Sequence, residues 1–311
     1  MINCIAYNQF LLLVSTIFCG TLAAQGLNPP QKPYIKFTKD FEYILGLGDL
    51  SLTVSPRNGG RITSLKMKNS EFLSQQSENR LNYGSTLWPS PQSMWNWPPP
   101  EILDSNPYTA SVENDTLVLF SSPDENLGLQ FEKRFSIDSR NHSVKMVFII
   151  KNCGKKNVLV SPWQISRVPK GAIAFFPKGK TDIRGKSFSA IPLKESNGIL
   201  SFQSDPHGKK EHLLSLTDGS EGWLACKKDN LLLIKKFNDV APELSAPGEG
   251  EVLLYSSGES SYIEIEVQGA YTELTPGGQL DWEIEWYLRE LPENQTNNLE
   301  ELVTRVRAEI N

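Results

Sequence analysis

The sequence predicts an all-β protein, folded as an antiparallel sandwich, and three observations carry this prediction. Apolar and polar residues alternate with period two in several segments, as they do in strands that bury one face. Turn-forming clusters such as Asn58-Gly59-Gly60 and Pro276-Gly277-Gly278 separate these segments. No internal repeat or break in composition divides the chain, so residues 41–311 are expected to form one domain. The clearest alternating segments are residues 50–54, 127–131, 144–150, 263–267 and 282–288.

Only the C-terminus shows a helical period. Five apolar residues fall on one side of a helix there, and Asn297 or Asn298 is placed to cap its start. The sequence therefore predicts one short C-terminal helix. The five apolar residues are Leu299, Leu302, Val303, Val306 and Ile310.

The N-terminal segment predicts export. Residues 10–18 are apolar apart from Ser15 and Thr16, a run too short to cross a bilayer, which needs about 20 residues. Small residues follow and end at Ala24, so residues 1–24 read as a signal peptide and the Pro-rich residues 25–40 as a linker. Cys19 offers lipid anchoring as a less favoured alternative, because Phe18 is bulky for that cleavage pattern. We expect a periplasmic or secreted protein whose mature chain has no transmembrane segment.

Composition excludes several classes of function. The 311 residues carry a net charge of −5 without a long basic run, so no nucleic-acid partner is expected. No metal-ligand spacing, P-loop, dinucleotide fingerprint or GxSxG motif is present, so we expect no metal and no cofactor. His142 lies in a turn-like segment, and His207 and His212 lie in a Lys-rich polar stretch. We expect a monomer.

Cysteine usage leaves one question open. The mature chain would keep only Cys153 and Cys226. In an oxidising compartment these two residues can form a disulfide, but two isolated cysteines are as often buried and free.

Residues 83–108 hold the most unusual composition of the chain. Trp88, Trp95 and Trp97 place three of the seven tryptophans within ten residues. Prolines at 89, 91 and 98–100 remove backbone donors, which predicts a rigid loop and argues against an interior strand. Flat indole faces suit the C–H faces of a sugar ring. The alternative is that these tryptophans close the open end of the sandwich.

Two further segments offer polar groups. In residues 261–269, period two turns Glu264, Glu266 and Gln268 away from the core, where they suit proton transfer or sugar binding on a concave sheet, or are ordinary solvated residues on a surface. In residues 161–168, Trp163, Gln164 and Arg167 can line a pocket, or comprise a core aromatic and a surface arginine.

Three motifs together resemble a known family. The stretch from Tyr83 to Pro100, the PWQISRV segment at 162–168, and the run from Glu266 to Leu288 are similar to the DUF4380 family. This uncharacterised bacterial group is placed in the galactose mutarotase-like superfamily. The resemblance covers residues 40–290 and implies a galactose mutarotase-like antiparallel β-supersandwich whose concave sheet binds saccharides.

The resemblance also implies roles for particular residues. The NGGRITSL segment, which contains Arg61, is similar to the early turn and strand of the superfamily. Glu266 and Gln268 resemble the E-x-Q of the mutarotase C-terminal strand, in which the glutamate is the general base. The histidine that serves as general acid in mutarotases has no counterpart in residues 162–167, because neither Gln164 nor Arg167 can exchange a proton near neutral pH.

These residues support three hypotheses. The first is an exported saccharide-binding protein without full mutarotase machinery. In it the indoles of Trp88, Trp95, Trp97 and Trp163 stack on sugar, and Arg61, Gln164, Arg167, Glu266 and Gln268 make polar contacts. The second is an aldose 1-epimerase-like isomerase with Glu266 as base and His207 or another group as acid. The third is a β-sandwich interaction module, for which a convex Trp-rich patch would be the evidence.

Overall fold

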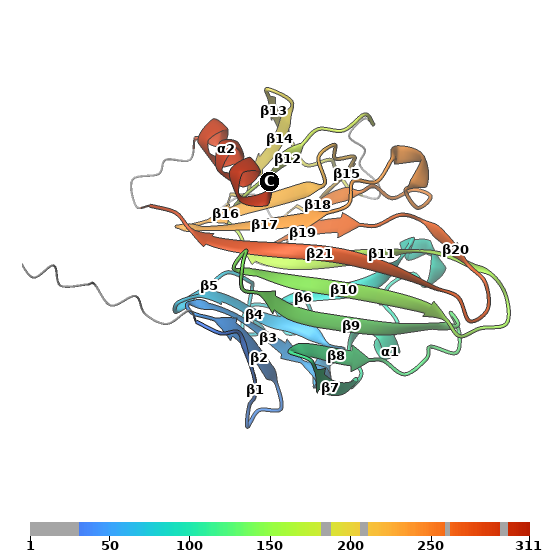
Figure 1. The fold of residues 1–311 in the computed structure, drawn as a ribbon. Coiled ribbons are helices and arrows are strands. Elements are labelled where there is room, and N and C mark those ends of the chain that lie inside the picture. Colours follow the sequence, from blue (N-terminus) through green and yellow to red (C-terminus); the bar gives the residue numbers. More distant parts are fainter. Residues whose placement is uncertain (1–30, 182–187, 206–210, 259–261, 293–297) are drawn as a thin grey trace, which may run out of the picture. The chain divides into compact units, whose positions relative to one another are not determined.

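Two antiparallel sheets dominate the chain from Lys32 onward, and these residues form one compact unit (Figure 1). This computed structural model describes residues 31–181, 188–205, 211–258, 262–292 and 298–311. The predicted signal peptide and His207 lie outside the described residues. Among the described residues, no helix is long and apolar enough to cross a membrane.

The first sheet, sheet A, has eleven strands. Nine follow one another through hydrogen-bonded neighbours, while β5 pairs with β4 and β20 pairs with β11. In spatial order the nine are β1 (Tyr34–Phe37), β2 (Tyr43–Leu47), β3 (Leu50–Ser55), β4 (Arg61–Met67), β6 (Ser85–Ser90), β11 (Val158–Pro169), β19 (Tyr262–Gln268), β18 (Val252–Ser256) and β15 (Leu213–Thr217), and the two others are β5 (Ser70–Glu71) and β20 (Thr272–Leu274).

The second sheet, sheet B, has ten strands. In spatial order they are β13 (Lys194–Ser196), β14 (Ile199–Gln203), β12 (Ile173–Pro177), β16 (Trp223–Lys228), β17 (Leu231–Phe237), β21 (Gln279–Glu290), β10 (Ser143–Asn152), β9 (Leu129–Asp138), β8 (Thr116–Phe120) and β7 (Thr109–Glu113). Short helical elements interrupt the connections: η1 (Pro56–Asn58), η2 (Gln92–Met94), α1 (Glu101–Asp104) and η3 (Pro242–Leu244).

The main hydrophobic core contains the apolar residues of both sheets that follow period two. Ile263, Ile265 and Val267 of β19 pack in it with Ile284 and Trp286 of β21. The predicted alternation is therefore confirmed: Glu264, Glu266 and Gln268 point to the opposite face of sheet A, because neighbouring side chains of a strand point to opposite sides.

The predicted C-terminal helix is confirmed as α2 (Leu299–Ile310). The side-chain oxygen of Asn298 accepts a hydrogen bond from the Glu300 amide at 3.0 Å, so Asn298 is the N-cap. Leu302, Val303 and Val306 pack on a second apolar cluster formed by outward-facing residues of sheet B, near β16 and β17 (Figure 1).

The exclusion of residues 83–108 from interior strands was wrong for residues 85–90. These form β6, a fully buried strand between β4 and β11, and Pro89 lies opposite Pro162 of β11. The carbonyl of Pro162 points toward Gly269, so the two prolines form a pair without mutual hydrogen bonds. On its other side, β6 pairs with β4 only at Ser85. The missing N–H of Pro89 therefore lies on the side of β6 that has no strand partner at this position.

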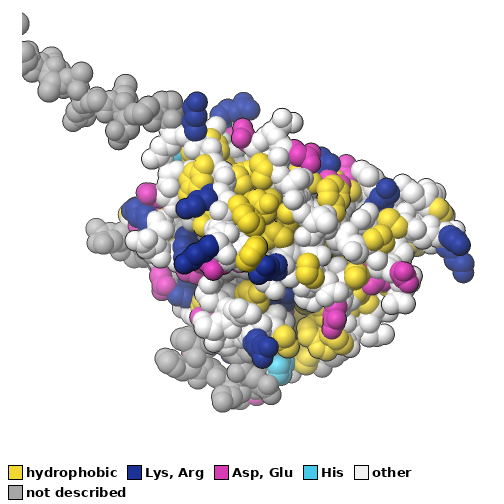
Figure 2. All heavy atoms as spheres, turned by 90° about the horizontal axis from the view of Figure 1, so that it is seen from below, with side chains coloured by type: hydrophobic (Ala, Val, Ile, Leu, Met, Phe, Trp, Pro, Cys, Tyr) yellow, Lys and Arg dark blue, Asp and Glu magenta, His cyan; other side chains and the backbone are white. Residues whose placement is uncertain are grey.

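Two other regions differ from or refine the sequence analysis. The edge strand β1 lies inside the predicted linker, because the Pro-rich composition ends at Pro33 and is followed by the strand-forming residues YIKF. Cys153 is exposed and Cys226 is buried, and both are free thiols. Figure 2 views the molecule from the side of β1 and β2, where hydrophobic side chains gather among lysines and arginines.

Candidate functional site

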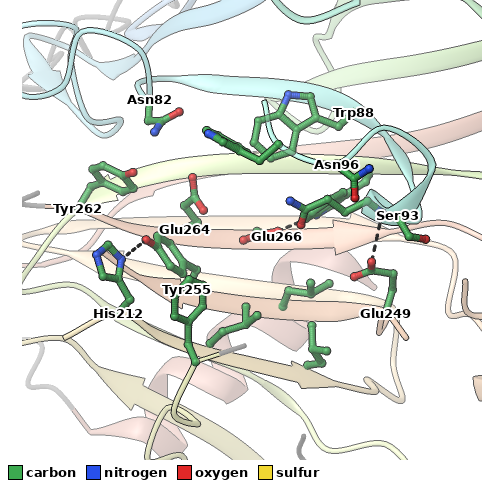
Figure 3. A pocket seen from close by; sticks show the side chains of 17 residues that line it. Asn82, Trp88, Ser93, Asn96, His212, Glu249, Tyr255, Tyr262, Glu264 and Glu266 are labelled. Atoms are coloured by element: carbon green, nitrogen blue, oxygen red, sulfur yellow. Dashed lines mark hydrogen bonds between the residues drawn. The ribbon is translucent and has the colours of Figure 1, made fainter. Parts of the chain in front are cut away.

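A cavity of about 600 Å³ lies on the face of sheet A that points away from sheet B (Figure 3). Its walls come from strands β6, β11, β19, β18 and β15 and from the loops next to them. Below it, Trp88, Trp163, Ile165, Leu216 and Leu253 form a separate apolar cluster. The cavity therefore has an apolar floor.

Cross-strand register brings the cavity residues together. Trp88 of β6 lies opposite Trp163 of β11. On the other side of β11, β19 follows, and Glu266 of β19 lies opposite both Ile165 of β11 and Leu253 of β18. Residues far apart in sequence thus form rows across the sheet, as directly opposed side chains do in antiparallel pairs.

Three tryptophans pack edge to face around Trp88. The ring of Trp88 lies 5.3 Å from that of Trp163, 5.7 Å from Trp95 and 5.9 Å from Trp97. Trp97 is 59% exposed at the cavity wall. Trp95 does not line the cavity; its indole N–H donates to the carbonyl of Pro89 at 2.8 Å and holds the loop after β6 against that strand.

Asp104 fixes the orientation of Trp88. One oxygen of Asp104 accepts hydrogen bonds from the Trp88 indole at 2.7 Å and from the Thr86 hydroxyl at 3.0 Å, and the other accepts from Arg61 at 3.1 Å. Arg61 is 4% exposed and does not line the cavity. The turn that contains Gly59 supports the position of Asp104. Gly59 has a φ of 66° and lies against the backbone of Asp104, because a Cβ at residue 59 would lie 2.0 Å from the carbonyl oxygen of Asp104.

Glu266 is the most deeply buried carboxyl group of the cavity, with 2% exposure. One of its oxygens accepts a hydrogen bond from the Trp163 indole at 2.6 Å. Burial raises the pKa of Glu266 well above its ordinary value, and the negative charge of Glu264 raises it further, while the hydrogen bond from Trp163 opposes the shift. Glu266 is therefore a carboxyl that holds its proton to unusually high pH.

Arg167 lies beside the cavity and does not line it. Its Nε donates to a carboxylate oxygen of Glu264 at 2.8 Å, and its guanidinium carbon lies 5.3 Å from the ring centre of Trp88. The side chain is 0% exposed, and its Nη1 and Nη2 have no hydrogen-bond partner in the described part of the chain. Arg167 thus contacts two lining residues, Glu264 and Trp88.

The wall opposite the tryptophans carries a histidine and a tyrosine. The Tyr255 hydroxyl lies 2.5 Å from Nδ1 of His212, and the ring of Phe188 stacks on His212 at 5.5 Å (Figure 3). Burial raises the pKa of Tyr255, so its hydroxyl stays protonated at neutral pH. The cavity therefore has a carboxyl group on β19 and, apart from it, a hydroxyl on β18 paired with an imidazole just before β15.

Five residues singled out by the sequence lie in the cavity: Trp88, Trp97, Trp163, Glu264 and Glu266. Arg61, Trp95 and Arg167 lie next to it, as described. Gln164 points to the inter-sheet core, where its amide nitrogen lies 3.7 Å from the sulfur of Met146, because its neighbour Trp163 takes the cavity face. Gln268 shares that face but is enclosed, and its side-chain oxygen accepts from the Ser90 hydroxyl at 2.6 Å.

Several cavity residues were missed. Tyr262 follows from the period of β19, and Tyr255 follows from the same period in β18. No sequence pattern marks Asn82, His212 or Glu249, because they reach the cavity from the ends of separate loops. The remaining lining residues are Gln92, Ser93, Asn96, Phe188, Leu214, Leu216 and Leu253.

Family membership follows from the sequence of the larger part of the chain. Residues 90–289 match the family described as a domain of unknown function, DUF4380, which is more than half of the chain. The chain belongs to this family. The DUF4380 resemblance is therefore confirmed, whereas no curated protein matches the sequence.

Solved structures share the fold of this DUF4380 chain. A galactose mutarotase-like protein from Clostridium acetobutylicum is 13% identical with a TM-score of 0.53, and the match covers 85% of this chain and 100% of that one. A galactose mutarotase related enzyme from Lactobacillus acidophilus is 11% identical with a TM-score of 0.54, with 81% and 99% covered. These likenesses confirm the mutarotase-like supersandwich and, at such identities, concern the fold alone.

A third structure is longer than this chain. A TPR-domain containing protein from Parabacteroides distasonis is 15% identical with a TM-score of 0.58, and the match covers 83% of this chain and 50% of that protein. This chain therefore spans half the length of that relative.

Proposed function

We propose that the protein binds a saccharide in the cavity on sheet A. The observation that carries the proposal is that the indoles of Trp88, Trp97 and Trp163 share one cavity with the buried carboxyl of Glu266. Indole faces bind the C–H faces of a pyranose, and carboxyl and amide groups bind its hydroxyls. The cavity volume of about 600 Å³ is in the range of small-ligand sites.

The polar lining supports the same proposal. Asn82, Gln92 and Asn96 add amide groups, each of which can both donate and accept a hydrogen bond. A sugar hydroxyl also donates and accepts, so amides and a protonated Glu266 match it better than groups with a single role. The galactose mutarotase-like name of the Clostridium relative agrees with this ligand class.

Titration calorimetry with mono- and oligosaccharides tests the proposal. Because Trp97 is 59% exposed, Trp97→Ala should leave the fold intact while weakening binding about tenfold through loss of a stacking face. Phe37→Ala is the matched control, since Phe37 is 53% exposed on β1 and outside the cavity. Absence of binding to every saccharide, or equal affinity in Trp97→Ala, would contradict the proposal.

A second candidate function is sugar isomerisation. It is favoured by the raised pKa of Glu266 together with the Tyr255–His212 pair in the same cavity, which supplies proton-transfer groups on two sides. Polarimetry on freshly dissolved aldoses would show mutarotation above the buffer rate, lost in both Glu266→Gln and His212→Asn. A rate equal to buffer excludes this activity and leaves saccharide binding as the function.

We also propose export, on the basis of residues 1–24. Mass spectrometry of the protein expressed with its own N-terminus should find a mature chain that begins at Gln25 outside the cytoplasm. An intact N-terminus in the cytoplasm would contradict export.

A further inference from the structure

Arg167 lies on the cavity face of sheet A. Side chains two residues apart on a strand point the same way, so Arg167 shares a face of β11 with Trp163 and Ile165, which belong to the cavity floor. Arg167 lies opposite Glu264 of β19, and Glu264 lies opposite Tyr255 of β18. Glu264 and Tyr255 both line the cavity, so Arg167 ends a row of lining residues.

The guanidinium of Arg167 is buried with unused donors. The side chain is 0% exposed, and its Nε donates to Glu264 at 2.8 Å. Its Nη1 and Nη2 have no hydrogen-bond partner among the residues that the structure describes. Buried polar atoms in folded proteins nearly always have partners, and a charged group needs them most, because its desolvation is costly. The two nitrogens therefore lack an acceptor.

Arg61 shows how this fold satisfies a buried arginine. Its Nη1 donates to the carbonyls of Leu81 and Tyr83 at 3.1 and 3.0 Å, and its Nη2 donates to Asp104 at 3.1 Å. Arg61 is 4% exposed and has acceptors on both terminal nitrogens. Arg167 is buried as deeply, and the described residues supply no acceptor to its terminal nitrogens. The contrast marks Arg167 as the arginine that is open to a ligand acceptor.

The charges of the cavity allow an anion beside Arg167. Glu264 is paired with Arg167, and burial holds Glu266 in its protonated form. Glu249, the third carboxyl group of the lining, lies beyond Glu266 (Figure 3) and accepts a backbone hydrogen bond at 3.2 Å. Burial raises the pKa of Glu266 and of Tyr262, and the positive charge of Arg167 opposes both shifts, so its field reaches the lining. An anion at this end shares one cation with Glu264.

The free edge of the guanidinium selects a carboxylate. Nη1 and Nη2 lie side by side on a planar group, and their N–H bonds match the two oxygens of a carboxylate as a bidentate pair. A sugar hydroxyl offers a single oxygen and no charge. A phosphate monoester brings about 1.5 to 2 negative charges next to Glu264. A hexose with a carboxylate at C6, a uronic acid, keeps its ring for the indole faces and adds one negative charge.

The end of the cavity beside Arg167 is lined by Asn82, Tyr262 and Glu264, which lie together in Figure 3. The ring centre of Trp88 lies 5.3 Å from the guanidinium carbon. Because Arg167 is 0% exposed, a carboxylate reaches Nη1 and Nη2 once one of these side chains turns aside. Rotamer changes of this kind are common on binding, even where the backbone moves little.

We infer that the saccharide bound by the cavity is a uronic acid, whose carboxylate pairs with Nη1 and Nη2 of Arg167. This inference rests on the proposed saccharide function and names its ligand class. Arg167 then holds two carboxylates, that of Glu264 through Nε and that of the sugar through its terminal nitrogens.

Calorimetric titration of the purified protein tests the inference at about pH 7, where a uronic acid is ionised. The probes are glucose, glucuronate, glucuronamide and glucose 6-phosphate, with the galactose series as a second set. In at least one series the uronate should bind at least about tenfold more tightly than the neutral hexose and the uronamide. The uronamide has the shape of the uronate without its charge, so this comparison isolates the ion pair and needs no variant.

Variants locate the effect. Arg167→Lys keeps a cation for Glu264 but loses the bidentate edge, so the preference for uronate over uronamide should fall about tenfold. Arg167→Gln combined with Glu264→Gln removes both charges together and should also abolish the preference, with folding checked by circular dichroism. The matched controls are Arg134→Lys and the pair Arg134→Gln with Glu132→Gln, an ion pair on β9 of sheet B, and these should leave the preference unchanged.

The outcomes separate the inference from the function on which it rests. If neutral sugars bind and the uronates bind no better, or if both Arg167 variants keep the preference, the uronate inference is overturned and saccharide binding stands. Tighter binding of a hexose 6-phosphate than of the uronate also overturns it. If no probe binds, both are overturned. A uronate preference that falls in Arg167→Lys and persists in Arg134→Lys supports the inference.

Discussion

The outward faces of the two sheets carry similar aromatic side chains but differ in what covers them. On sheet B, Phe175, Trp223 and Tyr287 lie in an apolar cluster under helix α2, and ion pairs such as Arg289–Glu309 join the helix to the sheet beside it. On sheet A, Trp88 and Trp163 form the floor of a cavity lined with carboxyl and amide groups. The same residue type therefore has a structural role on one face and is available to a ligand on the other.

Polar residues make the difference between these faces. Trp163 donates its indole N–H to the buried Glu266, so the aromatic floor of sheet A orients an ionisable group. Trp223 donates to Glu221 near the surface, and its ring is 1% exposed under the helix. Aromatic content alone does not distinguish a binding face from a packing face; the burial of carboxyl groups among the rings does.

The largest expected effect is the difference in stability loss between a variant that lacks a tryptophan on sheet B and one that lacks a tryptophan on sheet A. Trp223→Ala should lower the free energy of unfolding by about 3–5 kcal/mol, because it leaves a cavity under α2. Trp97→Ala should lower it by less than about 0.5 kcal/mol, because that ring is 59% exposed. Urea unfolding of both variants measures the contrast. Equal losses would mean that Trp97 is structural and that the two faces do not differ as described.

The pH dependence of stability separates the faces further. Below pH 4.5, its ordinary pKa, Glu266 is protonated in both the folded and the unfolded chain. Above this pH the unfolded chain loses the proton, whereas the folded chain keeps it because burial raises the pKa of Glu266. The free energy of unfolding therefore falls as pH rises from the pKa of Glu266 in the unfolded chain to its pKa in the folded chain, by at most about 1.4 kcal/mol per pH unit. Glu266→Gln should remove this fall.

Urea unfolding of wild type and Glu266→Gln from about pH 4 to pH 8 provides the measurement. The variant should gain stability relative to wild type as pH rises, and the exposed Glu283→Gln should not. A constant difference between Glu266→Gln and wild type would show that Glu266 is not held protonated by the fold.

The smallest expected effect concerns only the helix on sheet B. Asn298→Ala removes the N-cap of α2 and should lower the free energy of unfolding by about 1 kcal/mol, with saccharide affinity unchanged. Asn298→Asp keeps a capping oxygen and should restore most of the loss. A change in affinity on removing the cap would show that the two faces are coupled.

The sequence by itself determined the fold class and the orientation of most core residues. Period two in residues 263–267 assigned Ile263, Ile265 and Val267 to the core and Glu266 to the other face, because the geometry of a strand leaves no third choice. The helix followed from its own period and from the cap at Asn298. These are local properties, so a local pattern is sufficient to predict them.

Tertiary structure alone decided which strands are neighbours, and therefore which side chains form the cavity. Glu266 meets Leu253 and Trp163 only because β18 and β11 flank β19. His212 reaches the cavity from a polar segment with no pattern of its own. Pro89 occupies an interior strand because its partner is also a proline and its other side has no strand to bond. Sheet order depends on contacts between distant segments, and no single segment contains that information.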